Sequence, residues 1–267
     1  MNFIQNTSCL SKVKAEYQIL LHELKIRVKN HFTTDLIAYY LLGSIGRGDD
    51  KPGISDMDTE IIIKRKVRDE DEAWINKVKS EFEPKYPALE RLDIGLIEIK
   101  DLDQPDTNKL KFILKTDSVL IYGQDITNSF KSFVPSLELA KLLNNQYRNI
   151  LEEVINYLPE PDQEDQNHPE YIKDHVRWIA KNALRLSLGI IMVDQAYYTK
   201  SMEEMAHNFA VKYPIYQSQI QKALLQYHQP TNDLKQALAF LNELSQTIYQ
   251  LADKKFIKLE KRREIGG

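Results

Sequence analysis

The sequence predicts an α+β protein, because strand-like and helix-like segments alternate in its first half and only helical spacing follows. In this prediction residues 1–133 form an α/β domain and residues 134–267 form an all-α helical bundle. A length of 267 residues fits one large or two ordinary domains, and a hydrophobic content of 42% is sufficient for real cores.

The predicted first domain contains four apolar or alternating segments that are typical of strands. We expect these strands at residues 36–42, 59–64, 91–99 and 118–122. Helical spacing predicts helices at residues 10–30, 72–82 and 107–114, and a short helix starting in residues 45–50. Within the first helix, Leu20, Leu21, Leu24 and Val28 form one apolar stripe, and Pro84 ends the second helix.

The predicted second domain is helical from Pro135 onward. We expect helices at residues 136–157, 170–194, 201–213, 216–226 and 233–254, separated in part by Pro214 and Pro230. The segment 170–194 is apolar along much of its length and is predicted to be the central buried helix. A polar, acidic loop is expected at 159–169, and the basic tail 258–267 is expected to fray.

Composition excludes several classes of protein. A net charge of −3 argues against a general nucleic-acid binder, which usually carries a basic excess. The single cysteine, Cys9, permits no internal disulfide and suggests a reducing compartment. No apolar run is long enough to span a bilayer, and no signal peptide is recognisable. We therefore expect a cytoplasmic, monomeric protein that binds neither membranes nor nucleic acid.

The most informative motif combines a small-residue turn with two spaced carboxylates. The turn Gly43-Ser44 follows an apolar run, and Asp56 and Asp58 precede the next one. Side chains two residues apart share one face of a strand, so both carboxylates would point the same way. Carboxylate oxygens suit Mg²⁺, and a glycine turn lets backbone N–H groups approach phosphates. The motif predicts a metal-dependent nucleotide site.

This motif resembles that of the DNA polymerase β-like nucleotidyltransferase superfamily, in which a third carboxylate lies on a later strand. The resemblance implies a mixed sheet, ATP as co-substrate and two Mg²⁺ ions held by Asp56, Asp58 and Asp93. It implies that Ser44 binds a phosphate oxygen, that Arg47 neutralises phosphate charge, and that Asp93 also takes the proton of the acceptor hydroxyl.

Other acidic residues near these strands remain open alternatives. Glu98 is the reserve candidate for the third carboxylate, although it lies on the opposite strand face from Asp93, and Glu90 is a weaker one. Glu60 shares a strand face with Asp58, but we interpret it as the partner of a lysine or arginine rather than as a metal ligand.

The second half resembles the C-terminal domain of streptomycin/spectinomycin (aminoglycoside) adenylyltransferases. The resemblance rests on an apolar helix with Arg185, a turn with Lys200, and a further helix before Tyr213-Pro214. It implies that Lys200 reaches the ATP phosphates across an interdomain cleft, with Arg185 as the second candidate. Trp178 and Asp174 would correspond to residues that contact the antibiotic, although their spacing departs from the family by a few residues.

The resulting functional hypothesis is transfer of AMP from ATP to a hydroxyl of a small cationic acceptor, such as an aminoglycoside or spectinomycin. The acidic loop is compatible with a cationic acceptor. Two alternatives stay open at this stage. One is an antitoxin-like or regulatory nucleotidyltransferase that adenylylates or binds a protein, and the other is a catalytically silent nucleotide sensor.

Overall fold

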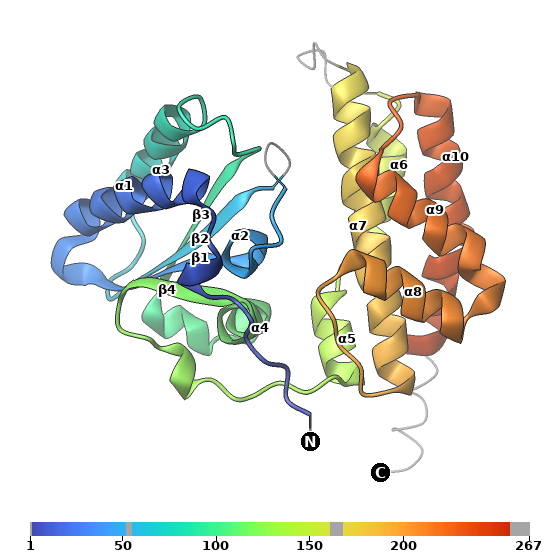
Figure 1. Cartoon of the computed structure of the whole chain (residues 1–267), viewed down its shortest axis with the longest axis horizontal. Helices are drawn as coiled ribbons and strands as arrows, with labels where there is room; N and C mark the ends of the chain where they lie inside the picture. Colours follow the sequence, from blue (N-terminus) through green and yellow to red (C-terminus); the bar gives the residue numbers. More distant parts are fainter. Residues whose placement is uncertain (1, 52–54, 161–167, 257–267) are drawn as a thin grey trace. The chain divides into compact units, whose positions relative to one another are not determined.

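The computed structural model describes residues 2–51, 55–160 and 168–256 of the chain (Figure 1). It divides into two compact units, one of residues 4–133 and one that begins at residue 134 and also takes in the N-terminal residues up to Phe3. Most of the predicted acidic loop, residues 161–167, and the basic tail lie outside the described residues.

The first unit is built around a four-stranded sheet in the order β3-β2-β1-β4. The strands are β1 (Leu36–Leu42), β2 (Met57–Ile63), β3 (Leu92–Glu98) and β4 (Ser118–Gly123). Strand β1 runs antiparallel to β2 and β4, whereas β2 and β3 are parallel, so the sheet is mixed. The predicted α+β class is confirmed, and each predicted strand is present within two residues of its expected bounds.

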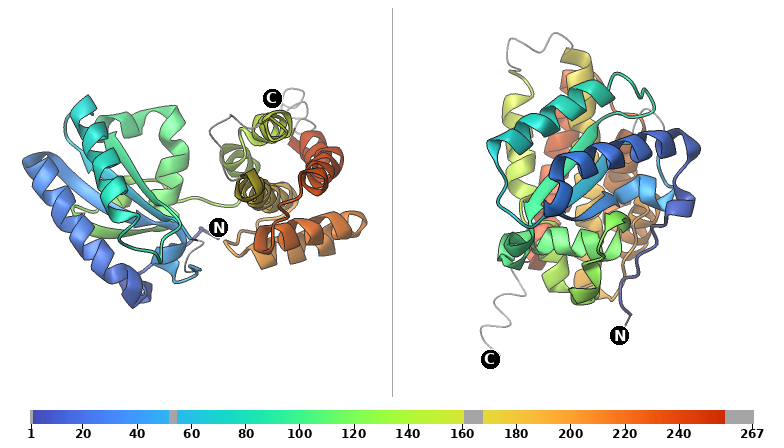
Figure 2. Two further views of the ribbon diagram at one scale, coloured as in Figure 1. Left: turned by 90° about the horizontal axis from the view of Figure 1, so that it is seen from above. Right: turned by 90° about the vertical axis from the view of Figure 1, so that its left-hand side faces the viewer.

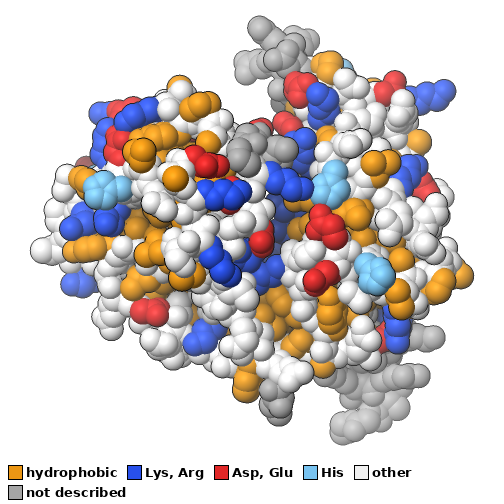
Figure 3. Space-filling view, viewed as in Figure 1, with side chains coloured by type: hydrophobic (Ala, Val, Ile, Leu, Met, Phe, Trp, Pro, Cys, Tyr) orange, Lys and Arg blue, Asp and Glu red, His pale blue; other side chains and the backbone are white. Residues whose placement is uncertain are grey.

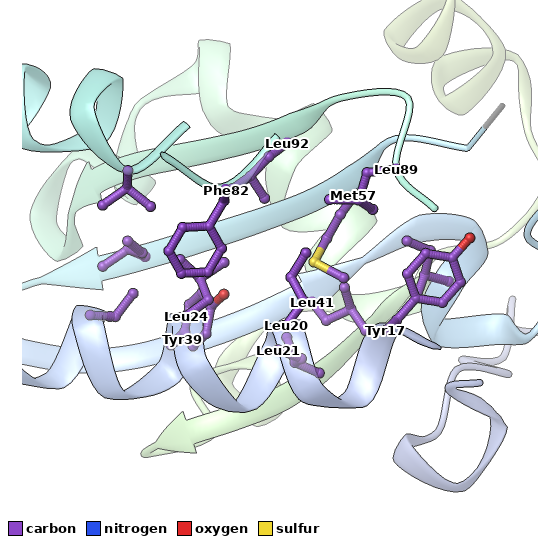
Figure 4. Close-up of a cluster of buried hydrophobic side chains, with 14 of the residues drawn as sticks. Tyr17, Leu20, Leu21, Leu24, Tyr39, Leu41, Met57, Phe82, Leu89 and Leu92 are labelled. Atoms are coloured by element: carbon purple, nitrogen blue, oxygen red, sulfur yellow. The ribbon is translucent and has the colours of Figure 1, made fainter. Parts of the chain in front are cut away.

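Two helices cover one face of this sheet. They are α1 (Ala15–Phe32) and α3 (Asp69–Phe82). The predicted apolar stripe of α1 is buried, and it packs with alternate residues of the strands, as Figure 4 shows for Leu24, Tyr39 and Met57. Helix α1 begins later than predicted because residues 10–12 form a separate 3₁₀ turn.

The opposite face of the sheet carries α4 (Asn108–Thr116), which lies away from α1 and α3 in both views of Figure 2. Leu114 of this helix packs with Tyr40, Leu42 and Ile62, the residues of β1 and β2 that point to this face. Successive side chains of a strand alternate between faces. Asp58, which is four residues from Ile62, therefore belongs to the α4 face as well.

The predicted motif lies at one end of the strands, and one row of paired residues crosses all four strands there. Asp93 of β3 is paired with Asp58 of β2, Asp58 with Leu42 of β1, and Leu42 with Ser118 of β4. The end of β1 and the beginnings of the other three strands thus meet at one edge. The short helix α2 (Gly43–Arg47) follows β1 directly at this edge.

The second unit is a helical bundle around one long central helix. Its helices are α5 (Leu137–Leu143), α6 (Tyr147–Tyr157), α7 (His168–Asp194), α8 (Met202–Lys212), α9 (Gln217–His228) and α10 (Leu234–Leu244). Helix α7 contacts each of the other five helices, and its segment 183–192 is buried at every position except Arg185. The prediction of a central buried helix is confirmed. Among the described helices, none has the length and apolar character needed to cross a membrane.

The prediction of a single helix over residues 136–157 is wrong, because the segment forms two helices, α5 and α6, with a turn between them. Asn144 ends α5, and its side-chain amide donates to the carbonyl of Ala140 at 2.8 Å. Such a bond competes with the helical hydrogen-bond pattern. The same amide fills the space beside Gly189 of α7, where a Cβ would lie 2.7 Å from Nδ2. Packing against α7 therefore sets the break.

The last predicted helix also differs from the structure. Residues 234–256 remain helical, but Ser245–Tyr249 forms a π-helical turn instead of an α-helical one. Within this turn the hydroxyl of Thr247 donates to the carbonyl of Glu243 at 2.6 Å, and Arg148 of α6 donates to the hydroxyl of Ser245 at 3.2 Å. Such turns arise where a side chain disturbs the regular hydrogen-bond ladder.

Candidate active site at one end of the sheet

Asp58 and Asp93 occupy directly neighbouring positions on the parallel strands β2 and β3. Met57, directly before Asp58, lies on the α1 and α3 face, as does Leu92 before Asp93, so both aspartates belong to the opposite face. The hydroxyl of Thr59 donates to the backbone carbonyl of Asp93 at 3.2 Å and fixes this register. The fold thus brings together two residues that are 35 positions apart in the chain.

Arg91 connects Asp56, the remaining predicted metal ligand, to this pair. Its Nη2 atom lies 2.8 Å from Oδ2 of Asp93 and 3.2 Å from Oδ2 of Asp56, and its Nε donates to the same oxygen of Asp93. Partial burial opposes the charge on Arg91, but the fields of Asp56, Asp93 and Asp58 outweigh it and raise the pKa of the guanidinium. We call Asp56, Asp58 and Asp93 the acidic cluster.

The acidic cluster fits a divalent metal ion in the chemistry of its donors. Carboxylate oxygens are the ligands that Mg²⁺ uses in proteins, and the guanidinium of Arg91 is a stand-in cation between two of them. In the part of the chain that the structure describes, no three acidic, histidine or cysteine side chains converge closely enough to hold a metal as they stand. Metal binding would therefore require side-chain rearrangement around Arg91.

The glycine turn lies directly against the acidic cluster. Gly43 has a φ of 74°, which favours glycine, and a Cβ at this position would lie 3.4 Å from Oδ2 of Asp58. Gly43 and Ser44 belong to the first turn of α2, so the helix begins two residues earlier than predicted. Ser44 is half-buried, and its carbonyl accepts the N–H of Asp49 at 3.0 Å.

Asp117 holds this turn in place, and it is not among the site residues predicted from the sequence. It precedes β4, and its carbonyl accepts the N–H of Gly43 at 3.0 Å. Its carboxylate accepts from Nη1 of Arg47 at 2.6 and 2.5 Å and from the hydroxyl of Ser8 at 3.2 Å. Arg47 also donates to Asp49 at 2.8 Å. A single aspartate after a helix carries no signal in a sequence, because only the pairing of β1 with β4 brings it to the turn.

Replacing Asp117 by Ala should therefore disturb the turn. We expect a loss of about 2 kcal/mol in the free energy of unfolding, because the change leaves the largely buried Arg47 with one partner. Urea unfolding measures this loss. Asp49→Ala removes the other, mostly exposed partner of Arg47 and should cost less than about 1 kcal/mol. Equal losses in the two variants would contradict the assigned role of Asp117.

Glu60 is buried on the same sheet face as Asp58, and the interpretation of it as a salt-bridge partner is wrong. No ion pair joins it to any residue among those described, and burial raises the pKa of its carboxyl to about 8. The carboxyl lies over Gly95 of β3, where a Cβ would come within 2.2 Å of Oε2. The absence of a side chain at Gly95 is what makes room for Glu60.

The reserve candidates for the third carboxylate do not join the acidic cluster. Glu98 ends β3, five residues beyond Asp93, which corresponds to about 16 Å along a strand. It is buried and pairs with Lys100 at 2.8 Å. Glu90 is exposed, and its N–H donates to the carbonyl of Ser55 at 3.4 Å.

The remaining predicted site residues belong to the helical unit. Lys200 is half-buried in the connection between α7 and α8, directly before Ser201, which caps α8 by accepting the N–H of Glu204. Arg185 lies exposed on α7. Trp178, also on α7, is 42% exposed, and Asp174 lies 3.6 Å from Arg177. The roles of these residues stay predictions.

Comparison with known proteins supports the fold. The crystal structure of spectinomycin adenyltransferase AAD(9) from Enterococcus faecialis, determined with ATP and spectinomycin, is similar to this chain with a TM-score of 0.54. The similarity covers 85% of this chain and 98% of that protein, at 13% sequence identity. No protein-family model matches the sequence, and no curated protein matches it either. The predicted resemblance in fold is confirmed.

Proposed function

We propose that the protein is a nucleotidyltransferase that transfers AMP from ATP to a hydroxyl group of a small cationic acceptor. The observation that carries this proposal is the pairing of Asp58 and Asp93 at the sheet end next to the Gly43 turn. The similarity in fold to an adenyltransferase crystallised with ATP supports it further. The same similarity favours an acceptor of the spectinomycin or aminoglycoside class.

In this proposal each part of the site has a defined task in the transfer of the adenylyl group. The acceptor oxygen forms a bond to the α-phosphorus of ATP, the bond to the β-phosphate oxygen breaks, and pyrophosphate leaves. Asp93, which is half-exposed, accepts the proton of the acceptor hydroxyl. Ser44 and the backbone of the Gly43 turn bind phosphate oxygens. Mg²⁺ held by Asp56, Asp58 and Asp93 would neutralise charge on the triphosphate and the leaving group.

The charge distribution is compatible with a small-molecule acceptor. Lysine, arginine and acidic side chains are interspersed on the visible face of the first unit in Figure 3, and no broad basic surface of the kind that tracks nucleic acid is seen on that face. The exposed ring of Trp178 offers an apolar surface on which a sugar or an aminocyclitol ring could stack. These features support the proposed acceptor class.

A direct assay tests the proposal. The protein is incubated with α-labelled ATP, Mg²⁺ and a panel of aminoglycosides and spectinomycin, and the products are separated by mass spectrometry. We expect one acceptor to gain the mass of an adenylyl group, with release of pyrophosphate. A parallel incubation replaces the panel with a cell extract. Label on a protein of the extract, together with no label on any antibiotic, would favour the regulatory alternative. ATP binding without any transfer would favour the nucleotide sensor.

Lys200 provides a separate prediction. If it supplies positive charge to the triphosphate, Lys200→Ala should weaken ATP binding roughly tenfold, because a lysine is a compact point charge for phosphate. Calorimetric titration of ATP measures this change, and the melting temperature should shift little. Lys235→Ala removes an exposed lysine of α10 and serves as the control. Equal ATP affinities of the wild type and both variants would exclude the role of Lys200.

A further inference from the structure

The guanidinium of Arg91 lies between two carboxylates of the acidic cluster. One guanidinium nitrogen, Nη2, lies within 3.2 Å of carboxylates from two separate segments, Asp56 before β2 and Asp93 in β3. A cation that bridges two carboxylates offsets part of their negative charge, and a bound divalent ion would do the same with twice the charge of a guanidinium. Asp58, the third member, adds to the negative field at the guanidinium.

Arg91 and a divalent cation would compete for the same oxygens. Both Asp56 and Asp93 use Oδ2 for Arg91, and the other oxygen of Asp93 lies 3.4 Å from Nζ of Lys79. Magnesium binds carboxylate oxygens at about 2.0–2.1 Å, a distance that leaves no room for a guanidinium between the same oxygens. The two cations also repel one another.

The side chain of Arg91 is able to leave while its backbone stays in place. Its carbonyl accepts the N–H of Met57 at 2.8 Å, which ties the start of β3 to the start of β2. Its side chain is 56% exposed, so little packing is lost when the guanidinium moves. Exposed ion pairs stabilise a fold only weakly. The contacts of Arg91 with Asp56 and Asp93 therefore change the net charge of the site more than they change the stability of the fold.

We propose that Arg91 competes with the divalent metal: its guanidinium offsets part of the negative charge of the acidic cluster when no metal is bound, and it is displaced when the metal binds. This inference rests on the proposed function, because it takes Asp56, Asp58 and Asp93 as the carboxylates that hold the metal. Arg91 thereby sets the metal concentration at which the site becomes loaded, and it keeps the unloaded carboxylates from repelling one another.

Titration of Mn²⁺ into the full-length protein, followed by the electron paramagnetic resonance signal of free Mn²⁺, tests this inference without any measurement of activity. We expect Arg91→Ala to bind Mn²⁺ roughly three- to tenfold more tightly than the wild type, because the competing charge is gone. Arg91→Lys should fall between the two, since a lysine offers a single point charge and cannot bridge two carboxylates in the same way.

Two further variants make the outcome unambiguous. Arg27→Ala removes an exposed arginine that pairs with Glu81 at 3.0 Å elsewhere in the same unit, and its Mn²⁺ affinity should match the wild type. Asp58→Asn should lose Mn²⁺ binding. If Asp58→Asn loses binding but Arg91→Ala binds no more tightly than the wild type, the inference is overturned and the proposed site stands. If Asp58→Asn binds like the wild type, or if no variant binds Mn²⁺, the metal site itself is wrong and the inference fails with it.

Discussion

Asp58→Asn should lower kcat/KM for nucleotidyl transfer by a factor of about 10³ or more, because it removes a charge from the centre of the acidic cluster. The substitution keeps the shape of the side chain, and Asp58 is only half-buried, so we expect the melting temperature to change by no more than a few degrees. Asp93→Asn should have a similar effect, since it removes both a metal ligand and the proposed proton acceptor. Steady-state kinetics with the acceptor found in the adenylylation assay measures both losses.

Glu98→Gln is the matched control for these variants. Glu98 lies on the same strand as Asp93 and is the alternative third carboxylate, but it pairs with Lys100 at the other end of β3. Transfer should therefore remain within about threefold of the wild type. A loss of transfer in Glu98→Gln together with normal turnover in Asp93→Asn would assign the third carboxylate to Glu98 and show the site to be misplaced.

Asp71→Asn should cause the largest loss of stability, about 3–5 kcal/mol in the free energy of unfolding at neutral pH. Asp71 is 1% exposed at the start of α3. Its carboxylate accepts two hydrogen bonds from Arg65, at 2.6 and 2.9 Å, and one from the N–H of Arg68 at 2.9 Å. Nε2 of His31 lies 3.0 Å from its other oxygen. An amide in this place would remove the buried one of the two carboxylates that pair with this guanidinium, and leave the more exposed Asp35.

The effect of Asp71→Asn should depend on pH in a defined direction. The hydrogen bonds from Arg65 outweigh the opposing effect of burial and, with Arg68 and His31, hold the pKa of Asp71 below its usual value of 3.8. Because the folded-state pKa is the lower one, the carboxylate stabilises the fold above about pH 4 and loses this effect as the pH falls. The stability gap between the wild type and the variant should therefore narrow as the pH falls below about 4.

Asp35→Asn separates this prediction from a general effect of charge. Asp35 accepts from Nε of the same Arg65 at 2.9 Å, but its side chain is 39% exposed. Its replacement should cost no more than about 1 kcal/mol in urea unfolding. Equal losses for Asp35→Asn and Asp71→Asn would show that burial of Asp71 contributes nothing to the strength of this pair.

The positions of most helices and strands could be predicted from the sequence, as could the part of the site whose residues are close together in the chain. Continuous apolar runs marked β1 and β2, because both faces of these strands are buried, and alternation marked β3. Helical spacing marked the stripe of α1, and a long apolar stretch marked the buried centre of α7. The spacing of Asp56 and Asp58 was enough to direct attention to the start of β2. Neither signal depends on how the strands pair.

Strand pairing brings distant residues to these carboxylates, and the local sequence pattern does not specify this pairing. Pairing of β2 with β3 places Asp93 beside Asp58 and leaves Glu98 about 16 Å away. Pairing of β1 with β4 brings Asp117 to the Gly43 turn, and the start of β3 brings Arg91 between two acidic residues. In the helical unit, the contact of Asn144 with Gly189 breaks a segment that reads as one helix. These features arise from contacts between residues far apart in the chain, and the local pattern of a sequence carries no record of such contacts.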